Sequence, residues 1–491
     1  MTAPSRAFGP FALDVPELAA TAELARRLAR LVKPGDIIAL KGDLGAGKTA
    51  FARALIQAMA GAAVEVPSPT FTLVQTYETA AGTVWHFDLY RLQSADEAIE
   101  LGIDQAFAEG ISLIEWPERL EALPAEALTL EFLFAEGEGA RKLLLRMGGD
   151  WRTRLVGESA SAERAAAIGR FLEQAGWQEA ARAPLQTDAS FRHYTRLSRG
   201  AATAMLMDAP PPLEDVRPFV RIDRHLRDQG FSAPAILAAD AGEGLLLLED
   251  LGDDLFSRVL QRQAADEAEL YGAAVDVLAE LHRRPLPNGL APYGLDLLLD
   301  ETDRVVDWYL PELTGRPTAP ELKQEYREIW TEVLGRADVL PAVLVLRDYH
   351  ADNLIWLPAR SGVARVGLLD FQDALEGSPA YDLASLLEDV RRPLAPALAE
   401  VMVQRYIRAS GVDDAAFRLA YAVFAAQRNT KLVGHWPRLF RRDGKPQYLK
   451  FMPQTWRLLE QDLKHPALSA LRAWFDRTIP PALRRTEIAA S

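Results

Sequence analysis

Two carboxylates and an amide in the second half of the chain have a spacing that suits phosphoryl transfer. Asp348 follows one apolar run, Asn353 comes five residues later, and Asp370 ends a second apolar run. Phosphoryl transfer needs a base for the incoming hydroxyl and hard oxygen ligands for Mg²⁺. We therefore expect Asp348 to be the catalytic base and Asn353 and Asp370 to bind Mg²⁺. The alternative, two buried strands that end in polar turns, leaves the order of these residues unexplained.

A second chemical motif, a phosphate loop, occurs near the start of the chain. Residues 42–49 read Gly-Asp-Leu-Gly-Ala-Gly-Lys-Thr, which satisfies G-x-x-x-x-G-K-T. Backbone N–H groups of such a loop surround phosphate oxygens, the lysine reaches the outer phosphates, and the threonine hydroxyl binds Mg²⁺. We expect nucleotide contacts from Gly42, Gly45, Ala46, Gly47, Lys48 and Thr49.

Hydrophobic periodicity predicts the elements that must hold these residues. The phosphate loop should lie between a strand over 37–41 and a helix over 50–60, with an amphipathic helix over 16–32 before them. In the second half we expect a helix over 165–175, a hairpin over 185–197, a strand over 245–250 and a helix over 267–282.

Composition limits the classes of protein to consider. With 491 residues the chain should form two or three domains, and its 55 basic against 69 acidic residues give a net charge of −14. This balance disfavours unaided nucleic-acid binding. The absence of cysteine excludes disulfides and thiolate zinc sites. Because we find no signal peptide and no apolar run long enough to span a membrane, we expect a soluble, cytoplasmic protein without a membrane partner.

Three further motifs accompany the phosphate loop. They are S-P-T-F at 68–71, H-x-D-L-Y-R at 86–91 and I-E-W-P at 114–117. With them, residues 10–155 resemble the ATPase subunit of bacterial tRNA threonylcarbamoyladenosine synthesis. The resemblance implies ATP and Mg²⁺ as cofactors and other subunits of that synthesis complex as partners. Residues 1–150 contain 13 basic and 21 acidic residues, so we expect tRNA contact to be only indirect.

The same resemblance implies roles for four residues. Thr70 would lie in a loop that senses the nucleotide, and Trp116 would lie beside the nucleotide. Asp88 and Glu115, at strand ends, would help to hold Mg²⁺ and water. Taken singly, Thr70 could be a turn residue, Asp88 a helix cap and Trp116 core packing, but together they favour the site. We interpret His86 as structural.

The second half resembles another family over residues 163–480. The resemblance is to the aminoglycoside phosphotransferase superfamily and, within it, to bacterial anomeric kinases of N-acetylmuramate and N-acetylglucosamine, which serve cell-wall sugar recycling. Asp370 begins D-F-Q where kinases have D-F-G. The closer match rests on residues 188–192, 206–211, 346–353, 369–374 and 426–431.

ATP contacts in this half are expected from two places. The turn of the predicted hairpin has small residues instead of glycines, so Ser190 would approach the phosphates with Arg192 as a nearby cation. Glu249 lies at the end of an apolar strand that fits the hinge between two lobes, where backbone groups would meet adenine. Met207 stands where a kinase has its phosphate-binding lysine. We interpret His282 as a helix-end residue and Asp382 as a brace.

The fold class that follows is an α/β P-loop NTPase domain over 1–155, a linker over 156–163, and a bilobal α+β protein-kinase-like domain over 164–491. The predicted function is bifunctional: an ATPase that supports tRNA modification, and an anomeric amino-sugar kinase. Two alternatives remain open. The kinase could use choline, an aminoglycoside or another small alcohol, or the second domain could bind nucleotide without catalysis, as Met207 would allow.

Overall fold

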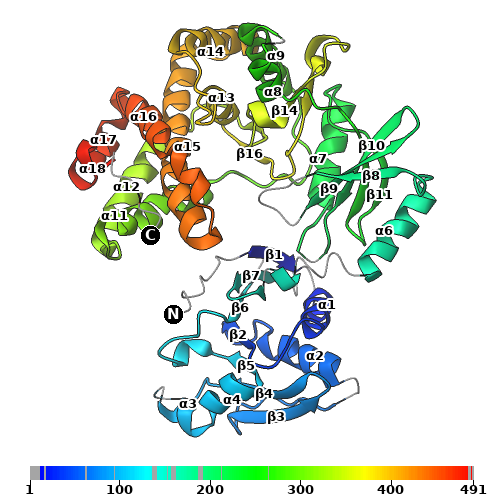
Figure 1. The fold of residues 1–491 in the computed structure, drawn as a ribbon. Coiled ribbons are helices and arrows are strands. Elements are labelled where there is room, and N and C mark those ends of the chain that lie inside the picture. Colours follow the sequence, from blue (N-terminus) through cyan, green and yellow to red (C-terminus); the bar gives the residue numbers. More distant parts are fainter. Residues whose placement is uncertain are drawn as a thin grey trace.

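The computed structural model describes residues 11–484 and 488, except for 16–17, 61–63, 93, 95, 135–140, 152, 156–161, 186–191, 212 and 264. Figure 1 shows three parts: a sheet-based N-terminal part, a small lobe around a second sheet, and a large helical lobe. Within the described residues, no helix is both long enough and apolar enough to cross a membrane.

The N-terminal part is built on one seven-stranded sheet in the order β1-β7-β6-β2-β5-β4-β3. Strands β6, β2, β5 and β4 run parallel, and the outer strands pair antiparallel with their neighbours. Parallel order brings the carboxyl ends of β2, β4 and β5 to one edge. The strands are β1 (Phe11–Val15), β2 (Ile37–Gly42), β3 (Val74–Thr79), β4 (Gly82–Asp88), β5 (Ile111–Glu115), β6 (Leu128–Phe134) and β7 (Arg141–Met147).

Helices cover this sheet and complete its core. Helix α1 packs on α2, whose buried residues include Phe51 and Leu55. Trp151 and Leu155, which follow the last strand, are buried in the same core. The guanidinium of Arg154 donates a 2.6 Å hydrogen bond to Asp36 Oδ2, which attaches this segment to the N-terminal part. The helices are α1 (Leu18–Ala29), α2 (Lys48–Ala60), α3 (Asp96–Glu100) and α4 (Ile103–Glu109).

The small lobe is a five-stranded antiparallel sheet in the order β11-β12-β10-β9-β8. Met207 lies on its central strand β10 and is 1% exposed, so it belongs to the core. The elements are α6 (Ala162–Gln174), β8 (Ala181–Pro184), β9 (His193–Arg199), β10 (Ala202–Asp208), α7 (Arg217–Asp228), β11 (Ile236–Asp240) and β12 (Leu245–Glu249).

The large lobe is mainly helical. It also contains two short two-stranded sheets, and Asp348 and Asp370 each follow a strand of one of them. β13 (Val343–Val345) pairs with β16 (Leu375–Gly377), and β14 (Leu354–Trp356) pairs with β15 (Val366–Leu368). The helices around them are α8 (Phe256–Gln261), α9 (Glu267–Leu281), α10 (Leu295–Thr302), α11 (Leu310–Thr314), α12 (Pro320–Ala337), α13 (Ala380–Leu387), α14 (Pro396–Ser410), α15 (Asp414–Asp443), α16 (Met452–Asp462), α17 (Ser469–Thr478) and α18 (Pro481–Arg484).

Among the described residues, Arg30 and Leu213 take part in contacts that join the N-terminal part to the small lobe. Arg30 bonds Glu163 at 2.8 Å, with both side chains exposed. Leu213, in the segment between β10 and α7, is 8% exposed and belongs to the core of the N-terminal part. Helix α6 begins at Ala162, inside the stretch 156–163 that was expected to be a linker, and residues 156–161 lie outside the described residues.

The predicted elements are present with small shifts. The helix expected over 16–32 spans Leu18–Ala29, and the strand expected over 37–41 is β2. The hairpin expected over 185–197 is formed by β8 and β9, and β8 ends at Pro184. Proline cannot donate to a strand ladder, which suits the last residue of an edge strand.

Candidate functional site

The first site lies where β2, β4 and β5 end. Glu115, the last residue of β5, is in register with Leu40 on one side and Asp88 on the other. The Thr49 hydroxyl donates a 2.8 Å hydrogen bond to Glu115 Oε2, and His86 Nε2 lies 3.0 Å from Glu115 Oε1. His86 is fully buried. The fold therefore brings the phosphate loop and the predicted acidic residues together, and gives His86 the structural place expected for it.

The phosphate loop has the conformation that its glycines permit. Gly42 has φ +131°, and a Cβ atom there would lie 2.5 Å from the carbonyl oxygen of Phe132, so only glycine fits. The loop ends at Lys48, whose ammonium donates to the carbonyl oxygens of Gly42 at 2.6 Å and Asp43 at 2.9 Å. The other predicted loop residues, Gly45, Ala46 and Gly47, lie between them.

Lys48 lies against Trp116 in this loop. Its ammonium is 3.8 Å from the centre of a Trp116 ring. Trp116 has φ +61°, an uncommon backbone for a bulky residue, and directly follows β5. Burial lowers the pKa of Lys48, while Glu115 and other nearby acids oppose that shift. Because the ammonium bonds carbonyl oxygens of its own loop, it must exchange these partners to meet an outer phosphate.

Thr70 and Asp88 form a second contact at this edge. The Thr70 hydroxyl donates to Asp88 Oδ2 at 2.7 Å, and the backbone N–H of Tyr90 donates to Asp88 Oδ1 at 3.2 Å. Asp88 is 4% exposed. The predicted loop residue and the predicted metal ligand are therefore direct neighbours.

Arg141 is a residue of this site that the sequence did not reveal. It lies on β7, and its guanidinium donates to the carbonyl oxygens of Ala46 at 3.0 Å and Gly45 at 3.4 Å. It therefore stabilises the phosphate loop from a strand that is separated from β2 by β6 alone. A single arginine in a strand carries no pattern that could have identified it.

The second site lies directly after β13. Arg347 has φ +69° and precedes Asp348, which is exposed. Asp382 holds this turn: its two carboxylate oxygens accept the backbone N–H groups of Leu346 at 2.6 Å and Arg347 at 2.9 Å. Asp382 is fully buried. This confirms that Asp382 is a brace.

Asn353 joins the two acidic residues of this site. Its side-chain amide donates to the carbonyl oxygen of Asp348 at 2.9 Å and lies 3.4 Å from Asp370 Oδ2. Asp370 has φ +59°, and Gln372 donates to its Oδ1 at 2.9 Å. Burial, with the charge of Asp348, raises the pKa of Asp370. The three residues predicted from their spacing do converge.

Three residues were predicted to contact ATP from the small lobe: Arg192, Ser190 and Glu249. Arg192 bonds Glu214 at 3.0 Å and lies 3.8 Å from Asp370 Oδ1, so it borders the site. Ser190 lies outside the described residues. The Glu249 carboxylate accepts bonds from Arg360 at 2.5 Å and the Ala235 N–H at 3.1 Å. These contacts occupy its side chain, and its own N–H donates to Ala235 O.

A buried polar cluster adjoins Asp348, and no role was predicted for it from the sequence. Glu301 is 1% exposed, and its Oε1 accepts bonds from Arg347 Nη2 at 2.8 Å and Lys431 Nζ at 2.7 Å. Its Oε2 accepts bonds from Tyr293 at 2.5 Å and Gln427 at 3.3 Å. Residues 426–431 had marked the closer resemblance, but only the fold brings them to the turn at Asp348.

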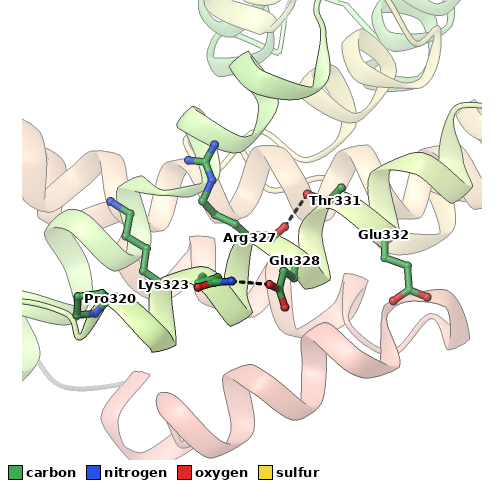
Figure 2. Close-up of a pocket in the computed structure, with 7 residues that line it drawn as sticks. Pro320, Lys323, Arg327, Glu328, Thr331 and Glu332 are labelled. Carbon is green, nitrogen blue, oxygen red and sulfur yellow. Dashed lines mark hydrogen bonds between the residues drawn. The ribbon is translucent and has the colours of Figure 1, made fainter.

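Two other features lie apart from this chemistry. His282 caps α9, and its Nδ1 lies 2.7 Å from the Tyr406 hydroxyl, as expected for a helix-end residue. A surface hollow of about 610 Å³ is lined by residues that all belong to α12, and Figure 2 shows these residues along the helix. Its side chains are those of one exposed helix face, and none of them belongs to the sites above. We therefore assign it no role in them.

In comparisons with known proteins, two family models match separate parts of the chain. The family described as "Threonylcarbamoyl adenosine biosynthesis protein TsaE" matches residues 15–143, and the "Phosphotransferase enzyme family" matches residues 181–421. The second match shows a kinase-like fold for the two lobes.

Two relatives in sequence agree with these matches. The N-acetylmuramate/N-acetylglucosamine kinase of Caulobacter vibrioides is 39% identical over 66% of this chain and 99% of its own length. The tRNA threonylcarbamoyladenosine biosynthesis protein TsaE of Rickettsia felis is 47% identical over 23% of this chain and 68% of its own. A solved choline/ethanolamine kinase family protein from Mesorhizobium loti is 14% identical over 64% of this chain and 97% of its own, with a TM-score of 0.44. The chain therefore belongs to the TsaE family in its N-terminal part and to the N-acetylmuramate/N-acetylglucosamine kinases in the remainder.

Proposed function

We propose that this chain is a bifunctional enzyme. One part is an ATPase that supports tRNA threonylcarbamoyladenosine formation, and the other is an ATP-dependent kinase of N-acetylmuramate and N-acetylglucosamine. We place the division as in the sequence: a P-loop NTPase domain over 1–155 and a bilobal kinase domain over 164–491, in a cytoplasmic protein. The observation that carries the kinase assignment is the convergence of Asp348, Asn353 and Asp370.

Asp348 has the place that a catalytic base requires. Its side chain is exposed, whereas its backbone is fixed by Asn353 and by the braced turn before it. A carboxylate fixed in this way can accept the proton of a sugar hydroxyl as that oxygen attacks the terminal phosphate. We propose that the attacking oxygen is the anomeric one, so that the product is a sugar 1-phosphate.

The residues around Asp370 fit Mg²⁺ bound together with ATP. Asp370 and Asn353 offer hard oxygen ligands and lie in contact. Within the described residues, no group of three or more histidine and acidic side chains could hold a metal. Mg²⁺ commonly takes only one or two carboxylates and completes its shell with phosphates and water. Bound there, it would neutralise charge on the phosphates, while Arg192 adds a cation at the border of the site.

The N-terminal site fits ATP in a similar way. The loop over 42–49 offers backbone N–H groups, Thr49 offers a hydroxyl beside Glu115, and Asp88 lies in the next strand. We propose that Thr49 and Asp88 bind Mg²⁺, that Glu115 orients the water, and that Trp116 lies beside the nucleotide. The acidic balance of this part supports tRNA contact through partner subunits of the synthesis complex.

The kinase proposal is tested by incubating the purified chain with Mg-ATP and a panel of acceptors. The panel contains N-acetylmuramate, N-acetylglucosamine, choline and an aminoglycoside. We expect phosphorylation of the two amino sugars alone. Turnover of choline or the aminoglycoside in preference to the sugars would support the alternative acceptor, and ATP binding without transfer to any acceptor would support a non-catalytic module.

A further inference from the structure

The polar cluster around Glu301 contains three cationic side chains and one carboxylate, so positive charge is in excess. Arg347 and Lys431 both bond Glu301 Oε1, and Arg304 lies close enough to help lower the pKa of Glu301 to about 2. Burial alone would raise that pKa, so the cations outweigh the loss of solvation. Three basic side chains thus surround one acid, and we name Glu301, Arg304, Arg347 and Lys431 the cation cluster.

The cation cluster is placed where an acceptor must bind. Arg347 directly precedes Asp348, and its backbone is part of the braced turn. Lys431 comes from α15 and Arg304 from the start of the π-helical turn Val305–Tyr309, so three separate segments converge beside the proposed base. The side chains of Arg347 and Lys431 are 22% and 17% exposed, whereas that of Glu301 is 1% exposed. The carboxylate of Glu301 is therefore buried, whereas the side chains of Arg347 and Lys431 remain partly accessible to solvent.

Two features beside the cluster bear on its charge and on its capacity to donate hydrogen bonds. His435, one turn beyond Lys431 on α15, has its pKa lowered well below the usual value by burial and then by Arg304, Arg438, Lys431 and Arg442. It is thus a neutral neighbour that lies 3.5 Å from Arg304. Arg347 Nε is buried without a hydrogen-bond partner in the described part of the chain, so Arg347 has an unused donor.

We propose that Arg304, Arg347 and Lys431 bind the carboxylate of an acidic sugar acceptor and so favour N-acetylmuramate over N-acetylglucosamine. The two sugars differ in the lactyl ether of N-acetylmuramate, which ends in a carboxylate. Glu301 keeps the cations apart and oriented, because Tyr293 and Gln427 fix its other oxygen. This inference rests on the proposed kinase function and extends it to specificity.

The test compares three acceptors with the full-length chain: N-acetylmuramate, its carboxyl methyl ester, and N-acetylglucosamine. For the unmodified enzyme we expect kcat/KM to fall about 10- to 100-fold from acid to ester, because a hydrogen bond to a charged group is lost. The variants Lys431→Met and Arg304→Gln should lower kcat/KM for the acid by a similar factor and change that for N-acetylglucosamine far less. Arg418→Gln is the matched control, since it lies exposed on α15 and bonds Glu400 instead.

The results of this test distinguish a failure of this inference from a failure of the proposed kinase function. Equal kcat/KM for acid and ester in the unmodified enzyme overturns the inference, as does an equal loss for both sugars in the two variants. Denaturant titration checks the folding of each variant separately from its activity, so an equal loss for both sugars counts only in a variant that is as stable as the unmodified chain. The ester comparison needs no variant. An enzyme that phosphorylates neither sugar overturns the proposed function and the inference together.

Discussion

The backbone N–H of Arg347 donates a 2.9 Å hydrogen bond to Asp382, which fixes the left-handed turn before the proposed base. In Asp382→Asn one oxygen becomes an N–H donor that faces a backbone N–H, so one bond is lost and repulsion replaces it. We expect the free energy of unfolding to fall by about 1–3 kcal/mol, and kcat to fall while KM for ATP changes little. Denaturant titration and kinetics measure both, with the exposed Asp300→Asn as control. Unchanged kcat would contradict the positioning role.

Asp348 and Asp370 should respond differently to the same substitution. Asp348→Asn removes the proposed base, which typically contributes a factor of about 10² to 10⁴ in rate, and should leave ATP binding intact. Asp370→Asn removes a charged ligand from a hard cation, and should weaken productive Mg-ATP binding. Turnover at saturating sugar and calorimetric titration with Mg-ATP separate the two effects. Near-normal turnover in Asp348→Asn would remove the assignment of the base.

Lys48 provides a test of whether the two activities are independent. Lys48→Ala should abolish ATP turnover by the N-terminal part, because no other side chain of the phosphate loop over 42–49 carries a positive charge. Sugar phosphorylation should persist, since Asp348 and Asp370 lie in another part of the chain. Assays of both activities on the same preparation measure this. Loss of both would show instead that the contact through Leu213 couples the two parts.

Asp223 on α7 should make stability depend on pH. Burial raises its pKa from 3.8 to about 7, although Arg227 and Arg224 oppose the shift. Because the folded pKa exceeds the unfolded one, the folded chain binds the extra proton between about pH 4 and 7, and the free energy of unfolding falls as pH rises through that window.

Asp223→Asn should remove this dependence. The stability of the variant relative to the unmodified chain should rise by on the order of 1 kcal/mol per pH unit between pH 4 and 7, and level off above it. Denaturant titrations at several pH values measure the difference. A difference that stays constant with pH would show that Asp223 is already ionised in the folded chain.

Structural features that depend only on residues close together in the sequence could be predicted from it. The loop over 42–49 needs only its own residues and the flanking strand and helix, and the structure has all three. Asp348 and Asp370 follow the short strands β13 and β15, and Asn353 directly precedes β14, so their spacing already indicated a shared site. Asp382 was expected to brace the lobe from its place in the stretch 380–384, and it lies in the first turn of the buried helix α13.

Contacts between distant segments could not be predicted in this way. Arg141 meets the loop at Ala46 across 95 residues of sequence, and Lys431 meets Glu301 across 130. Neither pair follows a periodicity or motif, because tertiary packing alone brings its members together. The Glu249 side chain shows the same limit, since its partner Arg360 lies in a loop of the large lobe.

The identity of the phosphorylated product tests the central claim most directly. Wild-type chain, N-acetylmuramate and Mg-ATP are incubated, and the sugar product is assayed for reducing power and for release of phosphate in mild acid. If Asp348 activates the anomeric hydroxyl, the product is a sugar 1-phosphate that is no longer reducing and loses phosphate in mild acid. An acid-stable phosphate on a sugar that still reduces would contradict the account.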